Sequence, residues 1–201
     1  MSALIKRLVE RLKGQSSGLT TKENLILRLN DQYPGDVGIF AAYFLNYIKL
    51  EAGQAIYLEA NEPHAYLSGN CVEVMATSDN VVRAGLTPKL RDTEVLCAML
   101  TYKAGMPEIL QGKEVTKNLR AYAPPFDEFQ ISVLTLGSGE EAVVNDLRGP
   151  LLVLVYEGKG TVNGVAVTKG DVYFVPDACA LDTRASEGCV IYIASANERI
   201  F

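Results

Sequence analysis

Histidine and tryptophan are scarce in this chain of 201 residues, which has one histidine, His64, and no tryptophan. Long apolar runs are also missing: none approaches the roughly 20 residues that a membrane-spanning helix needs. Basic residues are not in excess, because 19 Lys and Arg face 24 Asp and Glu, for a net charge of −5. A surface that tracks phosphates needs clustered Lys and Arg. We therefore expect neither a membrane nor a nucleic acid as a partner.

Closely spaced cysteine pairs are absent too. The four cysteines lie far apart in the chain and none forms a CxxC pair: Cys71, Cys97, Cys179 and Cys189. Charged residues interrupt the apolar positions near the N-terminus, so no signal peptide is visible. We expect reduced thiols, mostly buried, in a cytoplasmic protein.

The first third of the chain carries two helical patterns. Residues 3–13 place apolar side chains at helical spacing and end at Gly14. Thr20-Thr21-Lys22-Glu23 has the form of a capping box with Thr20 as N-cap, which predicts a second helix ending before Pro34. The basic residues of the first helix fall opposite its apolar stripe, which favours a solvated face over a membrane anchor.

From residue 44 onward the pattern predicts strands. Two are expected at 44–50 and 55–59, another through His64 to Leu67, and a short helix at 93–102. Residues 104–125 show little pattern and are interpreted as a linker or a surface excursion. In the last third, five strand-like segments alternate with Gly-rich turns, which is typical of a sandwich or jelly roll: 129–136, 151–157, 160–163, 172–175 and 190–194.

Two short glycine motifs could suggest a phosphate-binding loop. Gly137-Ser138-Gly139 and Gly158-Lys159-Gly160 are not followed by a helical pattern, as a P-loop would be. We interpret both as hairpin turns.

The most informative stretch is residues 58–89, where polar and charged side chains alternate with small apolar ones. It contains PHAYL at 63–67 and SDNVVRAGLTPK at 78–89. These segments, with YPGDVGIFAAYFLNYIKLEAGQAIYLEAN before them, closely resemble type I phosphomannose isomerases, the mannose-6-phosphate isomerases. The resemblance runs from about Asn24 to the C-terminus and is looser after Lys103.

The resemblance implies a zinc enzyme that interconverts mannose 6-phosphate and fructose 6-phosphate. In that family a Gln-x-His pair and a Glu from a preceding region bind the metal together with a later histidine, which His64 matches. No second histidine exists here, so the pair is absent. The chain therefore resembles the C-terminal part of the enzyme. We expect zinc to be absent or weakly held, since one ligand cannot retain it, and the preceding region of the same protein to be a partner.

Further site residues are expected in the same stretch. Moving protons between C1 and C2 and between O1 and O2 of a sugar builds negative charge on oxygen, which Arg83 would stabilise as a permanently charged fork. Lys89 would neutralise the sugar phosphate. Tyr66 is expected in the substrate pocket, and Asp79 orients Arg83 and Lys89. Glu73 is a candidate general base. The alternatives are structural: a surface pair of Asp79 with Arg83, a solvated Lys89, an ordinary strand carboxylate at Glu73, and core packing of Tyr66.

A weak internal repeat supports a cupin-like architecture. Gly53 begins an extended segment that leads to Pro63-His64, and Gly170 begins one that leads to Pro176-Asp177 without a histidine. Both resemble a metal-binding motif of the cupin fold. We predict an α+β, mostly β chain with cupin-like jelly-roll barrels and N-terminal helices: helical residues 1–35, a first cupin-like region carrying the site at 36–103, a connecting segment at 104–128 and a structural barrel at 129–201. The rival hypothesis is a non-catalytic sugar-phosphate-binding or interaction module on the same scaffold.

Overall fold

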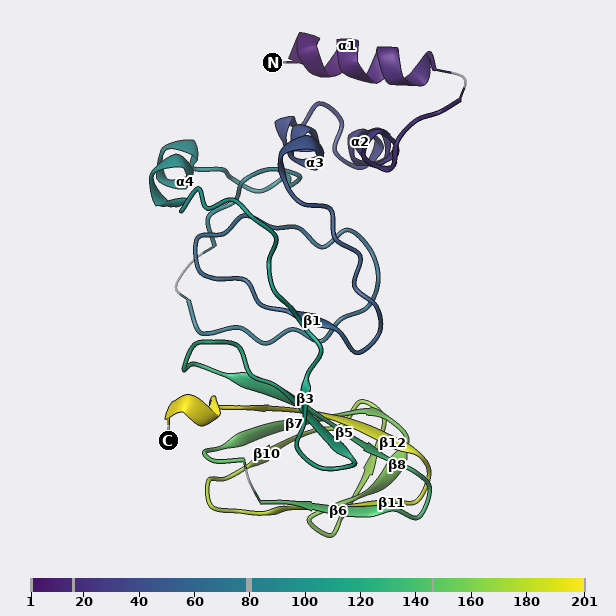
Figure 1. Cartoon of the computed structure of the whole chain (residues 1–201), viewed down its shortest axis with the longest axis vertical. Helices are drawn as coiled ribbons and strands as arrows, with labels where there is room; N and C mark the ends of the chain where they lie inside the picture. Colours follow the sequence, from purple (N-terminus) through teal and green to yellow (C-terminus); the bar gives the residue numbers. More distant parts are fainter. Residues whose placement is uncertain (1, 16, 79–80, 146, 201) are drawn as a thin grey trace. The chain divides into compact units, whose positions relative to one another are not determined.

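The computed structural model describes residues 2–15, 17–78, 81–145 and 147–200 (Figure 1). Two compact units interleave along the chain. Unit 1 comprises residues 1–50, 58–66 and 78–107, and unit 2 comprises residues 51–57, 67–77 and 108–201. The sequence instead predicted four consecutive ranges, and their assignment to two cupin-like barrels stays a prediction. In the described part of range 36–103, the only strand is β1 (Ala55–Ile56).

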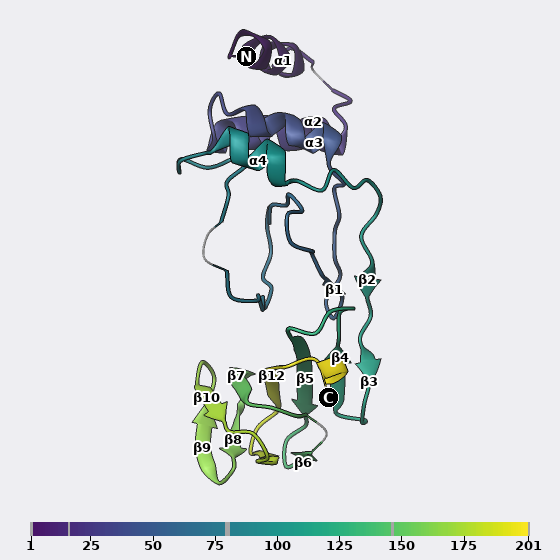
Figure 2. The same ribbon diagram turned by 90° about the vertical axis from the view of Figure 1, so that its left-hand side faces the viewer.

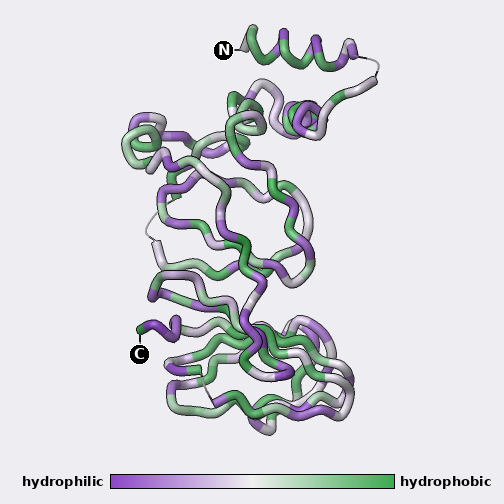
Figure 3. Tube along the Cα trace, viewed as in Figure 1, coloured by the Kyte–Doolittle hydropathy of each residue, from purple (hydrophilic) through white to green (hydrophobic). Residues whose placement is uncertain are grey.

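Unit 1 begins with the two predicted helices, α1 (Ser2–Lys13) and α2 (Thr21–Gln32). The capping box is confirmed: the Thr20 hydroxyl accepts from the Glu23 backbone N–H, and the Glu23 carboxylate accepts from the Thr20 N–H. Both bonds satisfy amides that the first turn cannot pair within the helix. Apolar and polar residues alternate along α1 (Figure 3). Its apolar face packs on α2 through buried side chains: Ile5, Val9, Leu12, Leu25, Ile26 and Leu29.

Three predicted elements of unit 1 are wrong or shortened. The chain turns through a 3-10 helix, η1 (Val37–Phe40), and α3 (Ala41–Phe44), and residues 45–50 form no strand. The predicted strand at His64–Leu67 is also not formed. Helix α4 (Thr93–Met99) starts at the predicted residue, with Asp92 as its N-cap, but ends three residues before the predicted end. Aromatic and β-branched residues in these segments suggested strands, but a strand forms only where a neighbouring strand completes the ladder.

Unit 2 contains every strand described. A two-stranded ladder joins β1 to β2 (Ile109–Leu110). Six strands form the larger sheet in the order β10–β7–β12–β5–β4–β3 (Figure 2), and four form a second sheet in the order β6–β11–β8–β9. The bounds are β3 Lys113–Glu114, β4 Leu119–Tyr122, β5 Gln130–Leu136, β6 Glu141–Val144, β7 Leu151–Glu157, β8 Lys159–Val162, β9 Val165–Thr168, β10 Val172–Val175, β11 Leu181–Ala185 and β12 Cys189–Ser195. A last 3-10 turn, η2 (Glu198–Ile200), follows.

The two larger sheets share one apolar core. Along β5, β7 and β12 every second residue is buried, as expected for strands with one face inward. The inward side chains of both sheets form one cluster that includes Leu134, Val153, Leu181 and Ile193, all fully buried. The predicted mostly β fold class is thus confirmed. Residues 104–125, interpreted as a linker or a surface excursion, contain β2, β3 and β4.

The glycine motifs lie where the chain passes between the sheets. β5 and β7 belong to the six-stranded sheet, whereas β6 and β8 belong to the four-stranded one. Gly137–Gly139 and Gly158 therefore form crossings and not the predicted hairpins. At Gly158, with φ +86°, a Cβ would lie 1.8 Å from the carbonyl oxygen of Gly188, so no side chain fits. The hairpin of this region is Asn163-Gly164 between β8 and β9, where both residues have positive φ.

Candidate functional site

Residues 58–66 of unit 1 carry the predicted metal ligand. His64 is exposed, and its Nδ1 lies 2.9 Å from the carbonyl oxygen of Glu62. The imidazole ring lies 5.6 Å from the ring of Tyr66, at an interplanar angle of 48°. Residues 58–66 form no strand, and the chain turns at Asn61, which has φ 64°.

Two acidic residues of this segment bind the chain that follows α4. The Glu62 carboxylate accepts a hydrogen bond from the Thr101 hydroxyl, and Glu59 forms an ion pair of 2.5 Å with Lys103. Both contacts join residues about 40 positions apart in the sequence, 39 and 44 respectively. They fix the stretch that presents His64 and Tyr66, which the sequence pattern had assigned to a strand.

The second predicted segment, residues 81–91, carries Arg83 and Lys89. Arg83 is half-buried and Lys89 is exposed. Between them Leu86 adopts φ 55°, a left-handed conformation that is unusual for leucine. The hydroxyl of Thr87 accepts a hydrogen bond of 3.1 Å from the Lys89 backbone N–H. The segment is therefore a sharply bent loop, with the two basic residues on either side of the bend.

Asp36 and Arg91 are residues of this region that the sequence analysis did not single out. The Asp36 side chain is 10% exposed, and it forms an ion pair of 3.4 Å with Arg91. Its carboxylate also accepts a hydrogen bond of 2.7 Å from the Gly38 backbone N–H, capping η1. The partners lie 55 residues apart, so no local pattern could have paired them, although Asp after Pro-Gly does indicate a cap.

Glu73 is exposed and belongs to unit 2. Asp79 lies outside the described residues. The roles assigned to Glu73, Asp79, His64, Tyr66, Arg83 and Lys89 accordingly stay predictions.

The side chains that the structure describes do not form a complete metal centre. Among the described residues, no group of three or more His, Cys, Asp or Glu side chains is arranged to hold a metal ion. His64 is the single histidine, whereas structural and catalytic zinc sites take at least three protein ligands.

The four cysteines are free, as predicted, but Cys71, Cys97 and Cys179 are exposed and only Cys189 is buried, so the expectation of mostly buried thiols is wrong.

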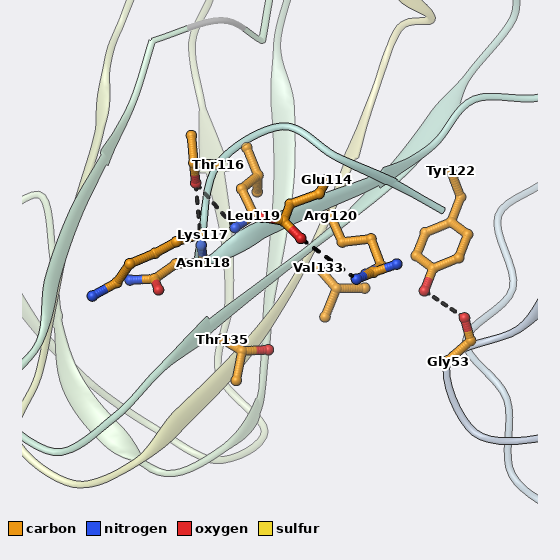
Figure 4. Close-up of a pocket in the computed structure, with 10 residues that line it drawn as sticks. All are labelled: Gly53, Glu114, Thr116, Lys117, Asn118, Leu119, Arg120, Tyr122, Val133 and Thr135. Atoms are coloured by element: carbon orange, nitrogen blue, oxygen red, sulfur yellow. Dashed lines mark hydrogen bonds and ion pairs between the residues drawn. The ribbon is translucent and has the colours of Figure 1, made fainter. Parts of the chain in front are cut away.

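A surface cavity of about 250 Å³ lies in unit 2, beside the turn from β3 to β4 (Figure 4). None of the predicted site residues lines it. Its basic side chains are already paired: Lys117 with Glu140 at 2.9 Å, and Arg120 with Glu114 at 4.0 Å. The cavity therefore offers no uncompensated charge to a sugar phosphate.

Among the residues that the structure describes, none of the helices has the length and apolar character that crossing a membrane would require.

Comparison with known proteins shows which fold and family the chain is similar to. Residues 1–45 match the family model for the helical insertion domain of type I phosphomannose isomerase. The chain is 47% identical over 204 residues to Mannose-6-phosphate isomerase 1 of Arabidopsis thaliana, covering 96% of this chain and 47% of the relative. It is 43% identical to the probable mannose-6-phosphate isomerase of Dictyostelium discoideum, in a match that covers 100% of this chain and 47% of the relative.

Solved structures of mannose-6-phosphate isomerases are also similar to this chain. The Salmonella typhimurium mannose 6-phosphate isomerase, crystallised with fructose 6-phosphate and zinc, matches with a TM-score of 0.80 and 27% identity, over 96% of this chain and 49% of that one. The fold is thus that of the mostly β, cupin-type isomerases. The chain is similar over nearly its whole length to type I phosphomannose isomerases, and it spans about half the length of the curated relatives it matches.

Proposed function

We propose that this chain supplies part of the active site of an isomerase that interconverts mannose 6-phosphate and fructose 6-phosphate. The observation that carries the proposal is the motif at residues 78–89, retained within a chain that is similar over 96% of its length to a relative named for this activity. The Salmonella structure, crystallised with fructose 6-phosphate, supports the same substrate class.

Arg83 is the group that stabilises the charge formed during the reaction. Transfer of a proton from one sugar carbon to the next leaves negative charge on the neighbouring oxygens. A planar guanidinium remains charged at any working pH and can donate two parallel hydrogen bonds to such oxygens. Because this interaction strengthens as the charge develops, it lowers the barrier more than it tightens binding of the substrate. Because Arg83 is half-buried, water competes less with the substrate oxygens for its hydrogen bonds.

Lys89 and Tyr66 bind the substrate. Lys89 is exposed at the far side of the Leu86 bend, where its ammonium can meet a phosphate as a compact point charge. Tyr66 is 60% exposed beside His64 and offers a ring edge and a hydroxyl to the sugar. Glu73 is the proposed general base and Asp79 a polar neighbour of the bound sugar phosphate. These two assignments rest on the motif alone.

Zinc belongs to the proposal for the protein of full family length. When bound, the ion supplies a Lewis acid for the sugar oxygens. This chain contributes His64, and the described residues do not complete a ligand set. We therefore infer that the chain alone holds zinc weakly and is inactive.

The remaining half of the family-length protein is the proposed partner. Unit 1 exposes several large apolar side chains, which would be costly to leave in water: Phe44 at 84%, Leu90 at 91%, Tyr102 at 71% and Met106 at 68%. Exposed apolar surface of this kind marks an interaction site. A cytoplasmic location stays a prediction.

The test is a complementation assay. The chain is assayed for conversion of mannose 6-phosphate to fructose 6-phosphate alone, and then with the part of the Arabidopsis relative that it does not match, both in the presence of zinc. Activity only in the mixture, lost on chelation, supports the proposal. Activity of the chain alone that a chelator leaves unchanged overturns both the zinc dependence and the need for a partner.

One observation favours the rival, a non-catalytic sugar-phosphate-binding module: the absence of a three-ligand group in the described chain. Under that hypothesis the chain binds fructose 6-phosphate, and the mixture stays inactive although the two parts associate. Binding measured by calorimetry beside the complementation assay separates the two functions.

A further inference from the structure

Two glycines bring the Arg83 loop against the start of η1. An alanine Cβ at Gly38 would lie 2.8 Å from the Leu86 backbone N, and one at Gly85 would lie 2.8 Å from the Cα of Gly38. Contacts under 3.0 Å with backbone atoms cannot be relieved by turning a side chain. Neither glycine is needed for a left-handed φ, so the requirement here is close approach of two backbones.

The Asp36 carboxylate lies at this contact. Its Oδ1 is 2.7 Å from the Gly38 backbone N, 3.0 Å from the position that a Gly38 Cβ would occupy, and 3.2 Å from that of a Gly85 Cβ. The same carboxylate pairs with Arg91. Asp36 thus touches the loop near its beginning, two residues after Arg83, and binds it again at its end, two residues after Lys89.

Limited exposure makes this an effective tether. The Asp36 side chain is 10% exposed and that of Arg91 is 39% exposed, so the pair is less screened by water than the other ion pairs that the structure describes in unit 1. A carboxylate with little access to water needs hydrogen-bond donors from the protein. Gly38 and Arg91 supply them, and in return the two ends of the loop are held at one point. The left-handed Leu86 lies between them and is kept in its strained conformation by this closure.

We propose that Asp36 is a positioning residue that holds the loop carrying Arg83 and Lys89 in the geometry needed to bind a sugar phosphate. Asp36 does not contact the substrate in this proposal. It acts through Gly38, Gly85 and Arg91. The inference rests on the proposed function for its consequence, but the tether itself is a property of the loop.

The experiment uses the whole chain labelled with ¹⁵N. Backbone amides of residues 81–91 other than Pro88, together with the Arg83 Nε–H, report on the loop, and titration with fructose 6-phosphate reports on binding. Asp36→Ala should shift and broaden the loop amides, raise their hydrogen exchange, and weaken binding of fructose 6-phosphate by about tenfold or more, the order expected for loss of a charged hydrogen bond. Signals of α1 and α2 should stay in place.

Matched variants separate positioning from general destabilisation. Asp31→Asn removes a carboxylate from an exposed pair with Lys13 in the same unit, at 3.9 Å, and should leave loop and binding unchanged. Gly85→Ala should reproduce the loop changes of Asp36→Ala. Gly14→Ala, where the nearest atom would be 3.4 Å away, should not. Arg91→Met should loosen the loop, and Arg91→Lys should restore most of its order, because the cation is kept.

The outcomes are distinguishable. Loop signals and exchange unaffected by Asp36→Ala overturn the positioning role, whatever the affinity. A disturbed loop with unchanged affinity for fructose 6-phosphate overturns the claim that the geometry serves binding. If the unaltered chain binds no fructose 6-phosphate while Asp36→Ala still disturbs the loop, the tether is established, and it is the proposed function of the isolated chain that fails.

Discussion

The hydroxyl of Tyr122 on β4 donates a hydrogen bond of 2.6 Å to the main-chain carbonyl oxygen of Gly53, 69 residues earlier in the sequence. Both residues belong to unit 2, and Gly53 lies in the turn that precedes β1. Figure 4 shows the contact at one end of the surface cavity. The bond joins the small β1–β2 ladder to the six-stranded sheet, although neither strand of the ladder pairs with that sheet.

Tyr122→Phe should therefore destabilise unit 2 modestly. The ring stays buried, and only the hydroxyl is lost, which costs about 1 kcal/mol for a typical hydrogen bond. Urea unfolding followed by circular dichroism measures the change, and Tyr156→Phe is the control because Tyr156 is 39% exposed. Equal stability of the two variants would show that the bond contributes nothing.

Leu134→Ala should destabilise the protein by about 2–5 kcal/mol, because a fully buried leucine leaves a cavity between the two sheets. Leu152→Ala is the matched control on the same sheet, since Leu152 is 56% exposed, and it should change the free energy of unfolding by less than about 0.5 kcal/mol. Comparable losses for both would mean that the outer face of the sheet is covered in solution.

The cysteines should react at two very different rates. Burial raises the pKa of the Cys189 thiol, and its side chain is 2% exposed. A thiol reagent should modify Cys71, Cys97 and Cys179 quickly in the folded chain, because the thiolate is the reactive form and must be reached by the reagent. Mass spectrometry should find the fourth modification only after unfolding. Four equally fast modifications of the native chain would contradict the buried position of Cys189.

The stability of unit 2 should depend on pH through Glu140. Hydrogen bonds from the Gly137 backbone N–H and from Lys117 lower the pKa of the Glu140 carboxyl from 4.5. Its contribution is therefore fully present above that unfolded value and is lost as pH falls through the lower folded pKa. Glu140→Gln should reduce the drop in melting temperature that occurs as the pH falls. Above pH 6 the melting temperatures of the unaltered chain and of the variant should vary with pH to nearly the same extent.

In a protein completed to family length, substitutions of Arg83 and of Lys89 should change different kinetic constants. Arg83→Lys keeps the charge but loses the planar fork, so kcat should fall by roughly 100-fold, about 2.7 kcal/mol, with little change in KM. Lys89→Ala should chiefly raise KM. If Arg83→Lys raises KM at unchanged kcat, the two assignments are reversed and Arg83 is the phosphate ligand.

Several features of this protein could be predicted from local sequence patterns alone. The capping box at Thr20–Glu23, the amphipathic α1, the alternating strands of unit 2 and the motif at residues 78–89 could all be recognised from the sequence, because each depends on neighbours within a few positions. The motif also indicated the family. Net charge and the lack of long apolar runs led to the expectation that neither a nucleic acid nor a membrane is a partner, which stays a prediction.

The tertiary structure decided what depends on distant partners. Strand patterns at residues 44–50 and 64–67 produced no strands, because a strand needs a second chain segment beside it. The Gly158 motif became a crossing between sheets because β7 and β8 pair with different neighbours. Asp36 meets Arg91 across 55 residues, and Gly38 meets Gly85 through backbone approach. Such contacts have no period or spacing in the sequence, so folding alone brings them together.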